Sequence, residues 1–393
     1  MNQQTWRPFL MVSLALCIGT IGTALSSPLY PIYQESWHLL PSHITFIFVA
    51  YMFGCLTTLL FLGRSSNSFG YIKTLQSGLF FAIIGLILSA YASNAYILGF
   101  GRFIIGIASG LISTSAMLGL IYTIPQSHKE SAPQLSSIIT VIGFGLGPFI
   151  GGVIAELSMR PLFTPYIPVI FGAILSLISL FKIKTTQVET QKFSIAPHLE
   201  LPETQYKSIF YVASFTAFCA FGSFSLFASL APSFIKDVIP WHGPFVSGTA
   251  IASILLISAV SQFIAKSMSM HRALNIGLCT LILSYILLSI CMIFHVSTLF
   301  FISDILVGMG HGFGLLGAFG LVHNMTNTEN RAAVISTYLF LAYLGTIVPI
   351  IAVGFLADHF GLMTGVLSFC FVIGLLCLYL LLRHRKLTQA QLA

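Results

Sequence analysis

The feature that most constrains this chain is a series of apolar runs, most of about twenty residues, separated by short polar breaks. A hydrocarbon layer about 30 Å thick takes about 20 residues to cross as a helix. The backbone finds no water there, so such runs form helices that satisfy their own peptide groups. We predict twelve membrane-spanning helices, at residues 9–30, 44–62, 72–92, 95–124, 135–155, 166–180, 209–234, 246–264, 273–294, 299–322, 332–356 and 362–382.

The charge distribution agrees with a membrane protein and limits its partners. Charged residues make up 7% of the sequence, whereas soluble domains carry roughly 25%. With the N-terminus inside, the inner loops and tails hold fourteen basic residues and the outer loops hold only Arg160 and Lys236. Basic residues concentrate on the cytoplasmic side, so we expect both termini in the cytoplasm. Orientation therefore explains the net charge of +7, and no nucleic-acid partner is expected.

Motifs of several other protein classes are absent from the sequence. It contains no HExxH, GxSxG or GxxxxGK[ST] pattern, which argues against a membrane-embedded enzyme and against ATP hydrolysis. The seven cysteines lie in apolar runs without a CxxC pair, and we interpret them as small core residues. No catalytic residue, metal or cofactor is predicted. The first run lacks a small-residue cleavage site and is expected to stay as a span.

A single long polar segment divides the chain near its middle. Residues 182–207 carry four lysines and three glutamates, a composition typical of a solvated linker. We therefore predict a six-helix bundle over residues 1–182, a cytoplasmic linker over 183–207 and a second six-helix bundle over 208–393.

The two halves also repeat each other. Three features recur at offsets of 201 or 202 residues, and they pair Arg64 with Lys266, Arg102-xxx-Gly106-xxx-Gly110 with Asp304-xxx-Gly308-xxx-Gly312, and Pro148 with Pro349. Repeated halves are typical of transporters that bind substrate at the repeat interface. The alternative, that apolar sequence aligns with itself by chance, does not account for the matching polar residues. A channel or receptor stays open as an alternative, but it leaves this repeat unexplained.

The fifth predicted span carries an unusual number of glycines. Gly143, Gly147 and Gly151 recur every four residues and therefore lie on one helical face. Between helices in lipid, small residues let the backbones approach closely, and Pro148 bends the helix. We predict a tight, kinked contact with a neighbouring helix.

This pattern resembles the antiporter motif of the major facilitator superfamily, at Gly143, Gly147, Pro148, Gly151 and Gly152. Two further signatures of that family have similar residues here. They are the loop between spans 2 and 3 and the R-xxx-G motif of span 4, at Gly63, Asn67, Gly70, Lys73, Arg102 and Gly106. The family has an aspartate where this chain has Asn67, so its charge pair at that loop lacks the carboxylate here.

The resemblance implies an all-α polytopic membrane protein with two six-helix bundles related by pseudo-two-fold symmetry. It further implies a secondary transporter that moves a small organic molecule by alternating access, most directly as efflux by proton antiport. An uptake permease, either proton symporter or facilitator, is the alternative. The first span lacks the acidic residue of many drug–proton antiporters, which weakens the expectation of proton coupling. We expect a monomer in a bacterial inner membrane, with substrate, protons and lipid as its partners.

Few ionisable side chains lie inside the spans, and such residues usually serve function. Arg102 and Asp304 occupy equivalent places in the two halves, and His311 follows Asp304 by seven residues on the same helical face. We predict that Asp304 carries the coupling proton, with Arg102 as its neighbouring cation; the resembling family uses its helix 4 arginine in proton coupling. His311 is a candidate proton relay or substrate contact. The alternative is a static ion pair and a histidine bonded to a backbone carbonyl.

The segment Gly354 to Gly361 also spells the loop signature, with Asp358 in place. It follows the eleventh span and therefore lies on the outer side, so it cannot act as the cytoplasmic loop. A capped helix end with a turn glycine and a gating role remain as interpretations.

Phenylalanines recur at every third position of the seventh span, at Phe215, Phe218, Phe221, Phe224 and Phe227. Three residues turn a helix by about 300°, so the row shifts by about 60° at each step and cannot all face one cavity. If part of the row lines the substrate path, the substrate has an apolar or aromatic portion.

Overall fold

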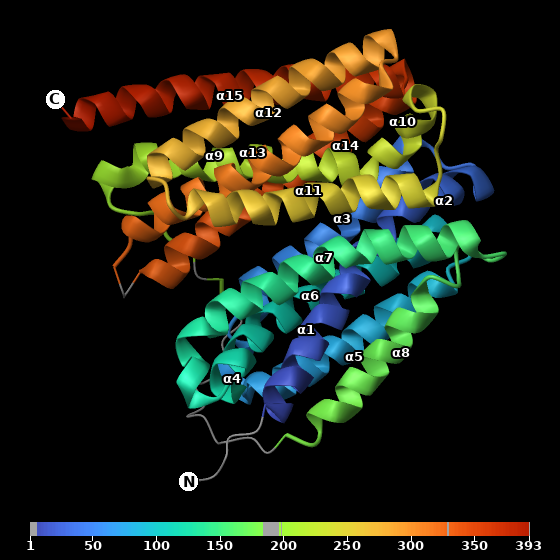
Figure 1. Ribbon diagram of the computed structural model, residues 1–393, viewed down its shortest axis with the longest axis vertical. Coiled ribbons are helices and arrows are strands. Elements are labelled where there is room, and N and C mark those ends of the chain that lie inside the picture. Colours follow the sequence, from blue (N-terminus) through green and yellow to red (C-terminus); the bar gives the residue numbers. More distant parts are fainter. Residues whose placement is uncertain (1–5, 184–195, 198, 328–329, 393) are drawn as a thin grey trace. The chain divides into compact units, whose positions relative to one another are not determined.

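A computed structural model describes residues 6–183, 196–197, 199–327 and 330–392 of the chain (Figure 1). The described residues form helices and no strand, which confirms the all-α prediction. The α-helices are α1 (Arg7–Ala24), α2 (Tyr30–Ser36), α3 (Pro41–Thr57), α4 (Ser65–Phe69), α5 (Tyr71–Ala90), α6 (Ala95–Thr123), α7 (Ala132–Leu157), α8 (Tyr166–Leu180), α9 (Lys207–Ser229), α10 (Ala231–Val238), α11 (Pro244–Ala265), α12 (Met270–Phe294), α13 (Ser297–Asn324), α14 (Arg331–Phe360) and α15 (Leu362–Leu392).

Eleven helices of the described part are long and apolar enough to cross a membrane, and α8 is a shorter apolar helix of 15 residues. These twelve segments lie at the twelve predicted positions. The first and seventh of these segments are not single continuous helices as predicted, because proline interrupts the regular backbone hydrogen bonding. The first span continues from α1 through a 3-10 turn with Pro28 into α2, and the seventh ends at Ser229, where α10 begins with Pro232 in its first turn.

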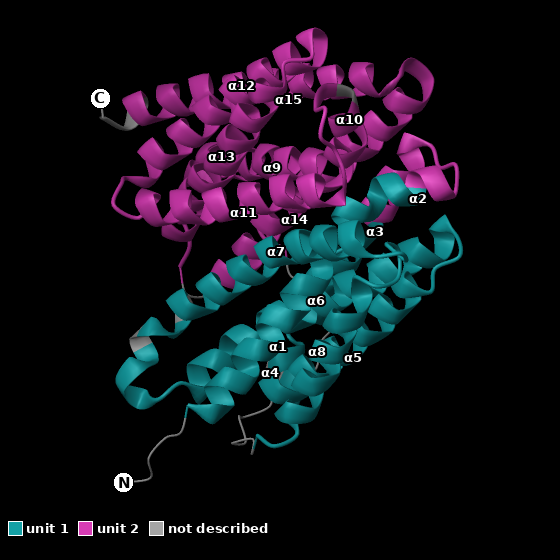
Figure 2. Cartoon of the chain, turned by 45° about the vertical axis from the view of Figure 1, so that its right-hand side comes forward, with its two compact units in different colours: residues 1–33, 50–197 teal, residues 34–49, 198–393 magenta. Residues whose placement is uncertain are grey.

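The contacts divide the chain into two compact units (Figure 2). Unit 1 comprises residues 1–33 and 50–197, and unit 2 comprises residues 34–49 and 198–393. The sequence placed the division at the linker alone, whereas the contacts also assign the end of α2 and the first half of α3 to unit 2. Residues 184–195 and 198, which form much of the predicted linker, lie outside the described residues.

Unit 1 is held together by apolar faces of α1, α5 and α6. Leu16, Leu75, Leu79 and Ile112 are almost completely buried in one cluster, and α8 covers the neighbouring faces of α1 and α5. The polar break predicted between the third and fourth spans is a helix cap, because the Asn94 side chain accepts hydrogen bonds from two backbone N–H groups of the first turn of α6.

Unit 2 is organised around α13. This helix packs against α9, α11 and α12, while α14 packs against α9 and α15 packs against α12. Because α13 carries both Asp304 and His311, the two ionisable residues predicted in the second half lie among three neighbouring helices.

Candidate functional site

The glycine face of the fifth span contacts α1. A Cβ atom added to Gly147 would lie 2.5 Å from the Ile21 carbonyl oxygen, and one added to Gly151 would lie 2.4 Å from the Leu25 carbonyl oxygen. Gly143 faces the same helix at Thr20. Pro148 lies inside α7 and Gly152 is buried beside this face. The residues of the predicted motif therefore bring the backbones of α7 and α1 together.

The loop signature lies between α3 and α5. Gly63 follows a π-helical turn over Thr58–Leu62, and Gly70 has a φ of 86° where the chain turns from α4 into α5. Lys73 is exposed in the first turn of α5. Asn67 lies in α4, and its side chain is outside what the structure describes.

Arg102 is a buried cation of unit 1. Its side chain is 1% exposed on α6, its Nη1 donates to the Thr23 carbonyl oxygen, and its guanidinium carbon lies 4.9 Å from the centre of the Tyr51 ring. Gly106 permits this approach of α3, because a Cβ there would lie 2.0 Å from the Tyr51 carbonyl oxygen. Among the described residues of unit 1, no carboxylate pairs with Arg102, and its Nε has no hydrogen-bond partner.

Asp304 is a buried carboxyl group of unit 2. It is 3% exposed on α13, its Oδ2 contacts the Ser253 hydroxyl of α11, and its Oδ1 has no partner among the described residues. The same hydroxyl lies 2.7 Å from the Ala250 carbonyl oxygen. A serine hydroxyl has one hydrogen to donate, so both contacts are satisfied together when Asp304 itself carries a proton. The geometry therefore fits a neutral Asp304.

His311 lies two turns further along α13 and is 7% exposed. Its Nδ1 is 2.8 Å from the Ser258 Oγ of α11, which also accepts from Gln262 Nε2 at 3.3 Å. The Ser258 hydroxyl has one hydrogen and two lone pairs, so it can receive the amide hydrogen and still donate to Nδ1, which is the arrangement that places the imidazole hydrogen on Nε2. Nε2 has no hydrogen-bond partner among the described residues. His311 is bonded to a serine, which differs from the predicted alternative of a backbone carbonyl.

Two glycines bring α11 close enough for these contacts. A Cβ at Gly312 would lie 2.3 Å from the Ser258 carbonyl oxygen, and one at Gly308 would lie 2.9 Å from the Ile254 carbonyl oxygen. Ser253 and Ser258 were not identified from the sequence. Small hydroxyl residues are common in membrane helices, and only their contacts with α13 separate these two from the others.

The structure places Arg102 in unit 1 and Asp304 in unit 2, and each has the contacts described above within its own unit. Asp304 and His311 share one face of α13 and one neighbouring helix, α11. The predicted role of Arg102 as the cation beside Asp304 stays a prediction.

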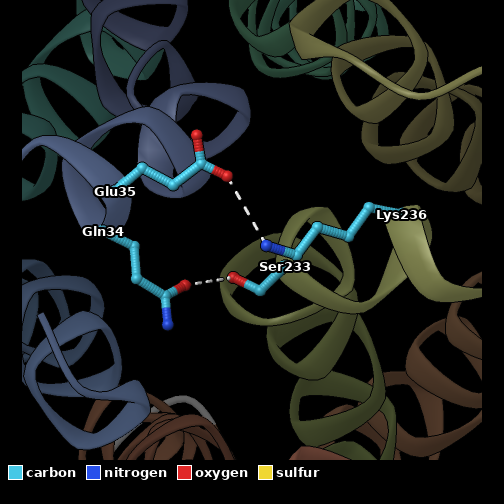
Figure 3. Close-up of polar contacts among 4 residues, drawn as sticks. All are labelled: Gln34, Glu35, Ser233 and Lys236. Carbon is cyan, nitrogen blue, oxygen red and sulfur yellow. Dashed lines mark hydrogen bonds and ion pairs between the residues drawn. The ribbon is translucent and has the colours of Figure 1, made fainter. Parts of the chain in front are cut away.

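A polar cluster within unit 2 holds residues 34–49. The Ser233 hydroxyl of α10 donates to Gln34 Oε1 at 2.9 Å, and Lys236 Nζ lies 3.5 Å from Glu35 Oε1 (Figure 3). At the start of α3, the Ser42 backbone N–H donates to Asp358 Oδ1 at 3.0 Å. Asp358 therefore caps the first turn of α3 rather than its own helix, while Gly361, with a φ of 86°, ends α14.

Comparison with known proteins agrees with this architecture. Residues 12–348 match the family profile described as Major Facilitator Superfamily. The chain is 24% identical over 196 residues to Multidrug resistance protein 2 of Bacillus subtilis, covering 48% of this chain and 47% of that protein. It is 22% identical over 154 residues to the riboflavin transporter RibZ of Clostridioides difficile, covering 39% of this chain and 34% of that protein. These alignments span about a third to a half of the relatives' lengths.

Solved structures extend the similarity to nearly the whole chain. A bacterial homologue of the human lysosomal transporter Spinster, in an inward-facing and unoccupied conformation, aligns with a TM-score of 0.75 at 13% sequence identity. The alignment covers 99% of this chain and 98% of that one. At this identity the likeness concerns the fold alone.

Proposed function

The chain belongs to the Major Facilitator Superfamily, and on this premise we propose that it exports a small organic molecule in exchange for protons. It is a multi-pass integral membrane protein and a transporter rather than an enzyme. From the basic residues of the inner loops and the bacterial relatives, we infer a bacterial inner membrane with both termini in the cytoplasm.

The contacts of Asp304 are the observation that supports its proposed role as the proton-binding group. In the described arrangement the carboxyl group is buried, one oxygen contacts Ser253 and the other has no partner. An ionised carboxylate with an unpartnered oxygen is unfavourable away from water, so this arrangement favours the neutral acid. When the surroundings of Asp304 open to water, the proton leaves, and the buried arrangement forms again only after a proton returns.

Two further features support export. The close contact of the α7 glycine face with α1 contains the residues of the antiporter motif, and one relative is named a multidrug resistance protein. That name describes the relative, and its alignment covers about half of each chain.

Uptake is the second function considered. The α1 helix carries no acidic residue, which leaves proton antiport with less support, and another relative is named a riboflavin transporter, a name that states no direction. A symporter and an antiporter respond in opposite ways to a proton gradient, so the direction of coupling is measurable.

The test uses the purified full chain in liposomes with riboflavin and ethidium as probes. An antiporter accumulates its substrate when the lumen is acidic, because protons leave as substrate enters. A symporter accumulates it when the outside is acidic. We expect accumulation with an acidic lumen, and accumulation only with an acidic exterior would replace export by uptake.

The Asp304→Asn variant tests whether Asp304 binds and releases the coupling proton. The amide matches the shape of the acid but cannot release a proton, so we expect gradient-driven accumulation to disappear while exchange of preloaded substrate continues. Glu203→Gln removes an exposed carboxylate and serves as the matched control. Full gradient-driven accumulation by Asp304→Asn would show that another group carries the proton.

A further inference from the structure

We propose that His311, Phe221 and Phe224 form a binding site within unit 2 for a flat aromatic ring that bears a hydrogen-bond acceptor. This substrate class rests on the proposed transport function and makes it more specific. The three residues come from α9 and α13, which pack against each other.

His311 supplies the polar group of this site. Gln262 donates to Ser258, and Ser258 in turn holds Nδ1 of the imidazole. In the tautomer in which Ser258 donates to Nδ1, Nε2–H is a donor without a partner among the described residues. Nε2 is not one of their buried unpartnered atoms, so it is accessible to a ligand. A ligand that supplies an acceptor, such as a carbonyl oxygen or a ring nitrogen, satisfies it.

Aromatic side chains surround that donor. The Phe221 ring lies 5.8 Å from the His311 ring with an interplanar angle of 30°, and the Phe224 ring lies 5.9 Å away at 54°. Tyr343 of α14 adds a ring 5.7 Å from Phe221. Aromatic rings attract one another in offset and edge arrangements at such separations. The cluster therefore offers both faces and edges to a flat ring.

Phe221 and Phe224 differ from the rest of their row in exposure and in ring contacts. Phe221 and Phe224 are partly exposed, whereas Phe227 is 1% exposed and packs 5.7 Å from Phe300. Phe215 is also partly exposed but pairs with Phe218 at 5.7 Å. Phe221 and Phe224 are the members of the row with ring contacts to His311.

The N–H group of His311 also limits the charge of the ligand. A cation would meet the N–H donor of His311 head on, so this site favours neutral or acceptor-rich rings over simple organic cations. Asp304 lies seven residues away on the same helix, about 10 Å along its axis. The ligand and the proton would therefore bind at different positions along α13, and α11 contacts both Asp304 and His311.

The experiment measures riboflavin binding to the full chain in lipid nanodiscs at one fixed pH and without a gradient. Riboflavin provides a flat ring system with carbonyl and ring-nitrogen acceptors, and its fluorescence reports binding. We expect Phe221→Leu and His311→Leu to weaken binding by about threefold or more, from the lost ring contact and the lost donor. His311→Gln keeps an N–H donor and should bind more tightly than His311→Leu.

Phe215→Leu is the matched control, because it makes the same change in the same helix without touching His311. If it weakens binding as much as Phe221→Leu, or if His311→Leu binds like the original chain, the proposal is wrong and the cluster serves packing only. Tetraphenylphosphonium, an aromatic cation without an acceptor, should bind equally to all four variants. Selective loss of its binding would also overturn the proposal.

An enlarged ring covers the case in which a truncated variant does not fold. Phe221→Trp keeps a large ring but changes it beside His311, so its riboflavin affinity should differ from that of the original chain, whereas Phe215→Trp should leave the affinity unchanged. Equal affinities of the two variants contradict the proposed site. Because no gradient is present, failure here is distinguishable from failure of proton coupling, which only the liposome experiment reports.

Discussion

At the scale of single residues, each unit buries one ionisable side chain within a span, and the two side chains have different contacts. Arg102 donates to a backbone carbonyl and faces the Tyr51 ring. Asp304 contacts the Ser253 hydroxyl through one oxygen, and its other oxygen has no partner among the described residues. The sequence indicated these two residues because charged side chains are rare in the spans. Their partners are ordinary serine, threonine and tyrosine residues, which no sequence pattern marks.

The Tyr51 ring is expected to stabilise unit 1 through the guanidinium above it. Tyr51→Leu removes the ring, and we expect the free energy of unfolding to fall by about 1–2 kcal/mol, because a desolvated cation–ring contact contributes about that much. Tyr51→Phe keeps the ring and removes the hydroxyl, which is hydrogen-bonded to Ser109, so it should lose less. Thermal unfolding in detergent compares them. Equal losses would assign the effect to the hydroxyl and not to the ring.

At the scale of helices, glycines set which pairs approach closely, and the pairs repeat between the units. In unit 1, Gly106 of α6 meets α3 and Gly147 of α7 meets α1. In unit 2, Gly312 of α13 meets α11, and Gly345 of α14 meets α9, where a Cβ would lie 2.1 Å from the Phe218 carbonyl oxygen. The repeat seen in the sequence therefore appears again as a repeat of helix contacts.

The close contact of α7 with α1 predicts that glycine-to-alanine substitution lowers stability at this contact but not at an open position. Gly147→Ala places a methyl group against the rigid Ile21 carbonyl, and overpacking of this kind costs about 1–3 kcal/mol. Gly99→Ala is the control, because a Cβ at this helical position of α6 meets nothing within 4 Å. Thermal unfolding should therefore show a lower midpoint for Gly147→Ala alone. A stable, fully active Gly147→Ala protein would contradict the close packing.

The carboxylate of Asp358 is expected to protect the start of α3. A hydrogen bond to a charged acceptor contributes about 1.5–3 kcal/mol, and Asp358→Asn weakens the one from the Ser42 N–H. We expect amide hydrogen exchange over residues 41–45 to become at least about tenfold faster. The peptides covering α5 provide the internal control. Unchanged exchange at residues 41–45 would mean that the cap does not stabilise this turn.

At the scale of the whole molecule, hydropathy predicts where the helices lie but not which unit a segment joins. The twelve apolar runs follow from the thickness of the bilayer, so they are readable from the sequence. Residues 34–49 belong to unit 2 through polar contacts with residues about 200 to 316 positions away. Nothing local in Gln34 or Ser42 specifies such partners. For the same reason, the pairing of His311 with Ser258 was not predictable.

The position of residues 34–49 leads to a last prediction about the transport cycle. Residues 1–33 and 50–197, on both sides of this segment, belong to unit 1, whereas Gln34 is bonded to Ser233 in unit 2 (Figure 3). Alternating access requires the halves of such a transporter to move against each other. We therefore expect the segment to leave unit 2 during each cycle, and a covalent link at this point should stop transport.

The link is made with Gln34→Cys and Ser233→Cys joined by a short, reducible bis-methanethiosulfonate reagent. The exposed Cys279 and the partly exposed Cys17 are first replaced by serine so that the reagent acts at the chosen pair. Substrate exchange in liposomes should fall to background after cross-linking and recover after reduction, while each single-cysteine variant treated alike stays active. The neighbouring Glu35 and Lys236 pair is exposed, and exposed ion pairs contribute little, so Glu35→Gln should change the rate only slightly. Full exchange by the cross-linked protein would mean that residues 34–49 remain on unit 2 throughout the cycle, and that movement occurs elsewhere in the chain.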